Sequence, residues 1–290
     1  MILLGVSGGP DSMYLLDLLY SKRKDIVVAT VNYNVRENSS YDVEVVRKYC
    51  QEKEIIFEHL EIDKNACFKG NFEQWARNIR FDFFKKLYEK YNCEALYLAH
   101  QKDDFIESFF MQKESNRKPD FFGIRAQNEI FGMNVLRPLV NKVFKSEILD
   151  YLHKNKIDYA YDYTNDLTIY TRNKIRDRLK NLSNKEKSKI IDEINKLNQN
   201  LQMTENEVLS EYIEWKNTNF SQDTFAKFKN KDRLVYKLIY EKFSNISLSK
   251  GKINSVAEFI LSKNRTSNYL LKNDVFMQKK ARKISFLIFD

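Results

Sequence analysis

The sequence Ile2-Leu3-Leu4-Gly5-Val6 opens the chain and leads without a break into Ser7-Gly8-Gly9-Pro10-Asp11-Ser12. An apolar stretch from Met13 to Leu19 follows. A short apolar run that ends in glycines and continues into a longer apolar segment is typical of a strand, a tight loop and a helix. The N-terminal segment therefore predicts a β-strand that feeds a glycine loop at the start of a helix.

The loop itself is suited to binding phosphate. Gly8 and Gly9 let the backbone approach an anion without interference from a Cβ atom, and the hydroxyls of Ser7 and Ser12 add donors beside the helix N-terminus. The loop contains no lysine, and Asp11 would repel phosphate unless a divalent cation lay between them, so we expect Mg²⁺ at Asp11. The alternative is a structural glycine turn in which Asp11 or Ser12 caps the helix.

The first half of the chain alternates short apolar runs with segments of helical spacing. The runs expected to form buried strands are Ile2 to Val6, Ile26 to Val31, Ile55 to Leu60 and Ala95 to Ala99; the helical segments lie near Ser12 to Ser21, Ser39 to Gln51 and Phe72 to Tyr91. This alternation predicts an α/β fold, a doubly wound and mostly parallel sheet with helices on both faces. Ligands of such sheets bind beyond the carboxyl ends of the strands, where the glycine loop and His100 would both lie.

The second half of the chain differs in composition. No proline follows Pro138, and Gly251 is the only glycine after Gly132. From about Arg172 the pattern becomes helical, with one apolar face formed by Ile190, Ile191, Ile194, Leu197 and Leu201. We predict a catalytic domain over residues 1–180, a linker helix over 181–215 and a small helical domain over 216–290.

The composition is that of a folded, basic protein. Of the 290 residues, 43% are hydrophobic and 14% aromatic, and the formal net charge is +9. This charge indicates a polyanionic partner, although a Lys-rich proteome would also produce it. Cys50, Cys67 and Cys93 form no CxxC pair, which disfavours a zinc site and favours reduced thiols in the cytoplasm. We expect no targeting segment, no membrane span and no membrane partner.

A second group of polar residues follows the strand expected at Ala95 to Ala99. It is the segment Leu98-Ala99-His100-Gln101-Lys102-Asp103-Asp104-Phe105-Ile106-Glu107-Ser108. Asp104 and Glu107 would share a helix face, where two carboxylates can hold magnesium or accept from an attacking amine. Acidic capping of the helix N-terminus is the alternative. For His100, the position at a strand end favours contact with a nucleotide or substrate over a place in the core.

Two further segments are rich in arginine. In Asn71 to Arg80, either Glu73 and Arg77 form an ion pair along the helix, or Arg77 reaches a phosphate or a developing charge. In Tyr170 to Arg178, basic residues are interleaved with aromatic ones, a combination that suits single-stranded nucleic acid. A solvated surface helix is the alternative for the second segment. The aromatic residues concerned are Tyr159, Tyr161, Tyr163 and Tyr170.

The glycine loop resembles the PP-loop of the N-type ATP pyrophosphatases, which adenylate a substrate oxygen and release pyrophosphate. Over about residues 1–180 the chain is similar to the tRNA(Ile)-lysidine synthases of that superfamily. Other PP-loop enzymes lack the YxRNxIR segment, which makes it the most discriminating match. The matching segments are Asn32-Tyr33-Asn34-Val35-Arg36 for NHxLR, Asn71 to Arg77 for NxExxAR, Leu98 to Ser108 for LAHxxDDxxET, Arg137-Pro138-Leu139 for RPL and Tyr170 to Arg176 for YxRNxIR.

The resemblance implies a reaction on tRNA(Ile) with a CAU anticodon. ATP, with Mg²⁺, would adenylate the C2 carbonyl oxygen of the wobble cytidine, and free L-lysine would then displace AMP to form lysidine. The implied ATP-binding residues are Ser7, Gly8, Gly9, Pro10, Asp11 and Ser12, and the catalytic candidates are Asp11, Arg77, His100 and Asp104. The lysine or magnesium candidates are Asp103, Asp104 and Glu107, and the tRNA-binding candidates are Arg172, Asn173, Arg176 and Arg178. Residues 216–290 would form a helical tRNA-binding domain; whether the chain forms a homodimer stays open.

The chain departs from this family's pattern at three places. Tyr33 stands where the family has His, Ser108 replaces Thr, and the glycine-rich RGxG stretch is represented only by Glu114 to Gly123. These changes concern the closing of that loop over lysine and leave the ATP site intact. Three rival functions remain: a tRNA thiolase, which would need paired cysteines; an amidotransferase synthetase, in which the basic helical half has no purpose; and a non-catalytic tRNA-binding protein, which would not need an intact loop.

Overall fold

The computed structural model describes residues 1–35, 39–64, 70–115, 119–160, 171–243, 246, 248–272 and 274–288, with the backbone alone at 171–173. The chain divides into two compact units, Met1–Asn198 and Gln199–Asp290. Within the described ranges, no helix combines the length and the apolar character that crossing a membrane requires.

The first unit is built on a six-stranded sheet of order β3-β2-β1-β4-β6-β5. Neighbouring strands are parallel except for β5 and β6, which form an antiparallel pair at the edge. The strands β2 and β3 lie on one side of β1, and β4, β6 and β5 lie on the other. The connections that leave β1 and β4 therefore turn to opposite sides, which opens a crevice at the carboxyl ends of these two strands. The strands are β1 Ile2–Gly5, β2 Ile26–Asn32, β3 Ile56–Glu61, β4 Ala95–Tyr97, β5 Gln127–Ile130 and β6 Met133–Leu136.

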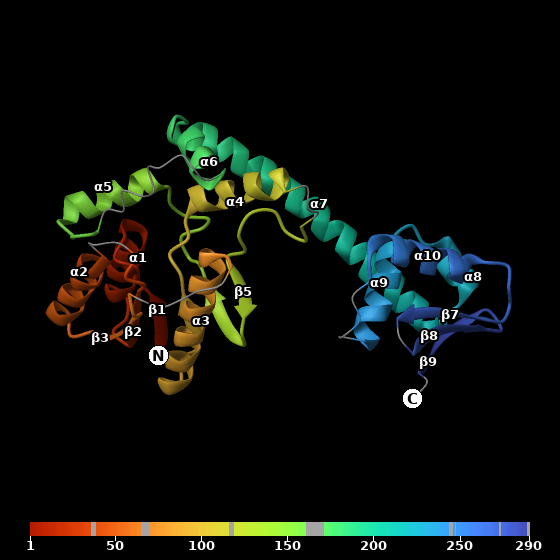
Figure 1. Ribbon diagram of the computed structural model, residues 1–290. Helices are drawn as coiled ribbons and strands as arrows, with labels where there is room; N and C mark the ends of the chain where they lie inside the picture. The colour runs from red at the N-terminus through yellow and green to blue at the C-terminus, as the bar shows by residue number, and fades with distance from the viewer. Residues whose placement is uncertain are drawn as a thin grey trace. The chain divides into compact units, whose positions relative to one another are not determined.

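Helices cover both faces of this sheet (Figure 1). Successive side chains of β1 point to opposite faces: Leu4 packs with one helical layer and Leu3 with the other. This two-sided burial confirms the predicted fold class, and the predicted strands and helices agree with the observed ones to within two residues at each end. One layer consists of α1 Pro10–Tyr20, α2 Ser39–Glu52 and α5 Lys145–Asn155, and the other of α3 Phe72–Lys90.

A separate helical cluster begins where β4 ends. It consists of α4 Lys102–Glu114, α6 Thr171–Lys180 and the first part of α7 Asn184–Asn217. Phe105 and Phe109 of α4 pack there with Ile175 of α6 and Ile194 of α7. This cluster fixes α4 and α6 beside the crevice of the sheet.

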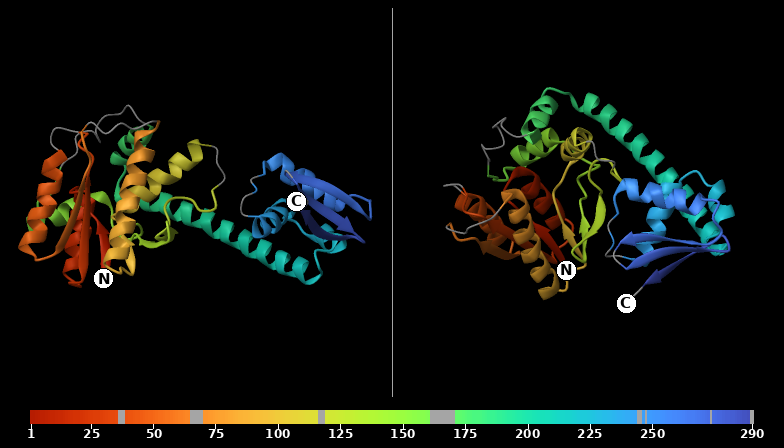
Figure 2. Two further views of the ribbon diagram at one scale, coloured as in Figure 1. Left: turned by 60° about the horizontal axis from the view of Figure 1, so that its bottom comes forward. Right: turned by 45° about the vertical axis from the view of Figure 1, so that its right-hand side comes forward.

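The second unit takes part of its core from α7, which is one continuous helix (Figure 2). Val208, Tyr212 and Trp215 of α7 are buried with the helices α8 Gln222–Lys227, α9 Lys231–Lys242 and α10 Lys250–Leu261. The predicted boundaries at 180 and 216 thus differ from the structural one, which falls inside α7 after Asn198. The reason is that the two halves of this helix are buried in different cores.

The second unit also contains a three-stranded antiparallel sheet that the sequence analysis did not predict. Its strands are β7 Ser267–Lys272, β8 Val275–Lys280 and β9 Lys283–Ile288, in the order β7-β8-β9. Ala281 and Arg282 form the turn between β8 and β9 and have φ values of 49° and 62°. Such turns normally carry glycine or Asn-Gly, so this hairpin has no turn signal in the sequence.

Candidate active site

The loop between β1 and α1 is shaped by its two serines. Ser12 Oγ donates to the Gly9 carbonyl at 2.8 Å and accepts from the Ser7 backbone N–H at 3.2 Å. Helix α1 begins at Pro10, and its N-cap Gly9 contributes no side-chain hydrogen bond. The Ser12 hydroxyl thus closes the turn, and the N–H groups of Ser12 and Met13 also donate to the Gly9 carbonyl. The positive end of α1 lies at the cavity, which Asp11 and Ser12 line.

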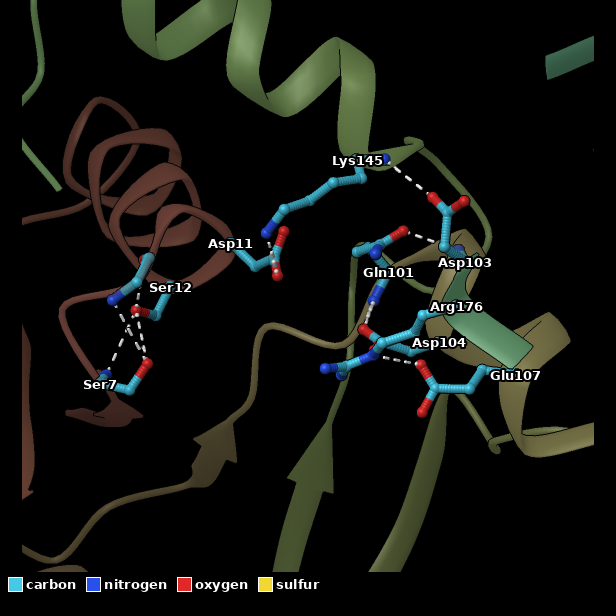
Figure 3. A network of polar contacts seen from close by, with 10 residues as sticks. Ser7, Asp11, Ser12, Gln101, Asp103, Asp104, Glu107, Lys145 and Arg176 are labelled. Atoms are coloured by element: carbon cyan, nitrogen blue, oxygen red, sulfur yellow. Dashed lines mark hydrogen bonds and ion pairs between the residues drawn. The ribbon is translucent and has the colours of Figure 1, made fainter. Parts of the chain in front are cut away.

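Asp11 lies in the first turn of α1 and faces α5 (Figure 3). Its Oδ2 accepts from Lys145 Nζ at 2.8 Å, whereas its Oδ1 is buried without a hydrogen-bond partner among the described residues. Lys145 is the first residue of α5 and was not among the predicted site residues. The glycine loop, which has no lysine of its own, thus receives one from a distant part of the chain.

The N-terminus of α4 is capped by neighbouring side chains. Gln101 is the N-cap: its side chain accepts from the Asp103 N–H at 2.7 Å, and its own N–H donates to Asp104 Oδ2 at 3.0 Å. One oxygen of Asp104 therefore takes part in capping, as the alternative interpretation held. The Asp104 side chain also lines the cavity at the crevice.

Asp103 points to a different place from Asp104. Its carboxylate accepts from the Lys145 backbone N–H at 2.9 Å and pairs with Lys187 Nζ at 2.6 Å. The side chains of Asp103 and Lys187 are only 16% and 11% exposed. Asp103 thus joins α4 to the beginnings of α5 and α7 and does not line the cavity.

Glu107, the remaining carboxylate of this segment, is buried and paired with an arginine. Arg176 Nε donates to Glu107 Oε2 at 2.8 Å, and the Glu107 side chain is 3% exposed. Burial disfavours the charged guanidinium, but the Glu107 carboxylate, together with the charges of Asp104 and Asp11, outweighs it and raises the pKa of Arg176. Arg176 lines the cavity, whereas Glu107, predicted as a lysine or magnesium candidate, lies behind it.

A cavity of about 650 Å³ lies at the carboxyl ends of β1 and β4. It joins the glycine loop to residues from α3, α4, α6 and the β5–β6 edge. Arg80, Arg125 and Arg137 also line it and were not predicted as site residues. The predicted site residues that line it are Ser7, Gly9, Asp11, Ser12, Arg77, His100, Asp104 and Arg176.

Helix α3 presents Arg77 to the cavity without the ion pair considered in the sequence analysis. The Arg77 guanidinium lies over the Phe81 ring, 4.6 Å from its centroid. Tyr33, the residue that replaces the family's His, lines the same cavity, and its hydroxyl donates to the Ala76 carbonyl at 2.9 Å. Tyr33 therefore ties the end of β2 to α3.

The predicted basic face of α6 is divided in the structure. Arg176 faces the cavity, whereas Arg178 is exposed, with its guanidinium 5.7 Å from the Phe110 ring centroid. The side chains of Arg172 and Asn173 lie outside the described residues, as do Arg36, Cys67, Tyr161, Tyr163 and Tyr170.

Comparison with known proteins agrees with this geometry. Residues 1–183 match the PP-loop domain family. The tRNA(Ile)-lysidine synthase of Mycoplasmopsis pulmonis is 43% identical over 290 residues, 99% of each chain. That of Mesomycoplasma hyopneumoniae is 33% identical over 97% of this chain and 94% of its own.

Among solved structures, the U34-tRNA thiolase NcsA of Methanococcus maripaludis is similar, with a TM-score of 0.57. The likeness covers 68% of this chain and 72% of that one at 19% identity, and it shows a shared fold alone. The PP-loop domain and the full-length relatives carry the assignment: this chain belongs to the family of tRNA(Ile)-lysidine synthases.

Proposed function

We propose that this protein joins free lysine to the wobble cytidine of tRNA(Ile) with a CAU anticodon. The C2 carbonyl oxygen of the cytidine attacks the α-phosphorus of ATP, and pyrophosphate leaves. The ε-amine of lysine then attacks C2, the C2–O bond breaks, AMP leaves with that oxygen, and the amine gives up a proton. One observation supports the proposal most: an intact PP-loop, Asp104 and Arg176 line one cavity in a chain 43% identical over its length to a tRNA(Ile)-lysidine synthase.

The ATP phosphates are proposed to bind at the glycine loop. The N–H groups of Gly8 and Gly9 and the N-terminus of α1 would bind their oxygens. The described residues contain no group of three His, Cys, Asp or Glu side chains that could chelate a metal. Mg²⁺ would therefore use Asp11 and complete its shell with phosphate oxygens and water, where it would neutralise charge on the leaving pyrophosphate.

Lys145 is proposed to exchange partners when ATP binds. Its ammonium holds Asp11 Oδ2 in the structure, and a Mg²⁺ bound to the free Oδ1 would neutralise the carboxylate and weaken its attraction for the ammonium. Once Asp11 binds Mg²⁺, Lys145 would turn to a phosphate oxygen of the nucleotide. It would then stabilise the charge that develops on pyrophosphate, as the lysine of other phosphate loops does.

The lysine substrate is proposed to bind near Asp104. This carboxylate lies in the cavity at the first turn of α4 and can attract the ammonium of the incoming amine. Glu107 would act indirectly by holding Arg176 in the cavity wall. His100 follows β4 and lines the cavity, where it would contact the cytidine or the nucleotide.

The second unit is proposed to add affinity for tRNA. Residues 199–290 carry 16 Lys and Arg against 10 Asp and Glu, so this unit accounts for most of the net charge of +9. Cationic side chains release counterions from the RNA when they bind its phosphates. Arg178, and Arg172 and Asn173 on the same helix α6, would add contacts on the first unit.

Nucleoside mass analysis tests the proposed reaction. A tRNA(Ile) transcript with a CAU anticodon is incubated with the protein, ATP, Mg²⁺ and lysine. We expect one cytidine per tRNA to be converted to lysidine, with equal amounts of AMP and pyrophosphate. Asp11→Asn should abolish both products and leave tRNA binding nearly unchanged, and a transcript with a CAC anticodon should be the unmodified control.

The outcomes separate the parts of the proposal. AMP and pyrophosphate without incorporated lysine would retain the ATP chemistry and reject lysine as the acceptor. An unmodified tRNA with no ATP consumed would reject the catalytic proposal and leave a tRNA-binding protein. Loss of tRNA binding in Asp11→Asn would contradict the assignment of Asp11 to the ATP end of the cavity.

A further inference from the structure

One wall of the cavity carries four arginines, two from α3 and two from the open end of the β5–β6 hairpin, just before β5 and just after β6. They are Arg77, Arg80, Arg125 and Arg137, here called the arginine cluster. Within the described part of the chain, none of the four forms an ion pair with a carboxylate. The cluster therefore places uncompensated positive charge in the cavity.

Two of the guanidiniums are oriented by aromatic rings. Arg77 lies 4.6 Å from the centroid of Phe81, and Arg125 lies 4.6 Å from the centroid of Phe121. Stacking uses the face of the guanidinium and leaves its edge for a ligand. At Arg125 one edge group, Nη2, donates to the Asp120 carbonyl at 3.4 Å, and the others stay available. A planar fork held in this way is suited to a phosphate, which it can bind through two parallel hydrogen bonds.

Arg137 is the buried member of the arginine cluster. It is 6% exposed, and its Nη1 donates to the Arg125 carbonyl at 3.0 Å and to Asn128 Oδ1 at 2.6 Å. Its Nε is buried with no hydrogen-bond partner among the described residues. A buried N–H of a charged group is costly to leave unpaired, so a ligand acceptor would stabilise this arrangement.

The arginines also destabilise one another in the absence of an anion. Burial lowers the pKa of Arg137, and the neighbouring charge of Arg77 lowers it further. Burial and the charge of Arg80 act in the same direction on Arg77. A bound anion would relieve both the burial of these charges and their mutual repulsion.

We propose that the arginine cluster binds the RNA phosphodiesters on either side of the nucleotide that reacts. This inference rests on the proposed function, in which one cavity must hold two polyanions. The triphosphate of ATP has its own site at the glycine loop, on α1. The reacting nucleotide is still joined to its chain, so it carries a phosphate on each side into the cavity when its base turns outward. Four guanidiniums provide bidentate contacts for two such phosphates.

The experiment measures binding of an anticodon stem-loop RNA and, separately, of ATP to the full-length protein. Arg80→Gln and Arg125→Gln remove exposed members of the cluster and should spare the fold. Each should weaken RNA binding about tenfold at low salt and reduce the slope of log affinity against log salt by about 0.7 to 1. Neither should change the affinity for ATP more than twofold.

Arg47→Gln is the matched control. Arg47 also lies over a phenylalanine ring, 5.3 Å from the centroid of Phe57, but it pairs with Glu44 on α2 and does not line the cavity. It should leave both affinities unchanged. Replacing the phosphate on either side of the target cytidine with an uncharged methylphosphonate should weaken RNA binding to the wild-type protein. The same replacement should weaken RNA binding to the Arg80→Gln or Arg125→Gln variant much less, because the contact is already lost there.

Other outcomes overturn the inference. Weaker ATP binding with unchanged RNA binding would assign the cluster to ATP, and no change in either would make it a solvated surface. Additive losses from the methylphosphonate and the arginine variants would also contradict direct contact. Because these are binding measurements, cluster-dependent RNA binding without lysidine formation would retain this site and reject the proposed reaction.

Discussion

Replacing Gly8 with alanine tests whether the shape of the glycine loop is as constrained as the structure shows. Gly8 has a φ of +82°, and a Cβ atom there would lie 2.5 Å from the carbonyl oxygen of Asp42 in α2. The left-handed conformation costs a non-glycine residue roughly 1–2 kcal/mol. Relieving an overlap with helix backbone adds roughly 1–3 kcal/mol.

The expected loss of unfolding free energy for the first unit is therefore about 2–5 kcal/mol, the sum of both effects. For a unit of this size each kcal/mol shifts Tm by about 2–4 °C, so Tm should fall by about 4–20 °C. The assay is denaturant and thermal unfolding without nucleotide, followed by ATP binding under conditions where the variant is folded. ATP binding should weaken as well, because the loop must leave its present shape to accept the methyl group.

Gly9→Ala is the control for this prediction. Gly9 has φ −70° and ψ 164°, which any residue can adopt, and its Cβ would meet Ser7 Oγ at 3.5 Å. Its stability should change by less than about 1 kcal/mol, the cost of alanine at an N-cap. If Gly8→Ala were as stable as the wild type, or if both variants lost the same stability, the described conformation of the loop would be wrong.

Three further predictions concern packing and ion pairs. Asp103→Asn and Lys187→Met, measured singly and together in a double-mutant cycle of unfolding, should show a coupling energy of about 1–3 kcal/mol. If their effects on stability were additive, the ion pair between these two side chains would be excluded. Lys279→Met should lower the stability of the second unit to denaturant by about 2–4 kcal/mol, because the three N–H groups of the buried Lys279 ammonium are shared among three carbonyls and a hydroxyl at the end of α10. Lys280→Met, at an exposed position, should leave the stability unchanged. Burial raises the pKa of Cys50 to about 12, so in the folded protein its thiol should resist iodoacetamide at pH 8 and react only as fast as the protein unfolds. The free energy of unfolding should fall as the pH rises above 9, because there the thiol ionises in the unfolded state alone. Rapid labelling of Cys50 in the folded protein would contradict this.

Much of the first unit could be predicted because its central strands β1, β2 and β4 are buried on both faces. Apolar runs such as that at Ile26 are continuous, and the intervening helices have clear 3.6-residue spacing. The glycine loop and the His100 strand end were placed together by the rule that parallel strands present their carboxyl ends on one edge. Each of these inferences needs only local sequence and one topological rule.

The remaining site residues depend on contacts between distant segments. Lys145 reaches Asp11 across 134 positions, and nothing near Lys145 in the sequence marks it as part of a phosphate site. The three-residue spacing places Asp104 and Glu107 on the same face of α4. Packing of α6 nevertheless buries Glu107 behind Arg176 and leaves Asp104 in the cavity. Local patterns cannot distinguish such carboxylates, because the difference is made by a helix 69 residues away.

The sharing of α7 between two cores determines how the chain can be divided. A cut at residue 216 would produce a C-terminal fragment without Val208, Tyr212 and Trp215, whose side chains are 2%, 3% and 0% exposed in the intact protein. Such a fragment would expose Phe225 and Leu238 to water and should aggregate. A fragment that starts at residue 199 keeps all three residues, so measurements of RNA affinity on the isolated unit should begin there.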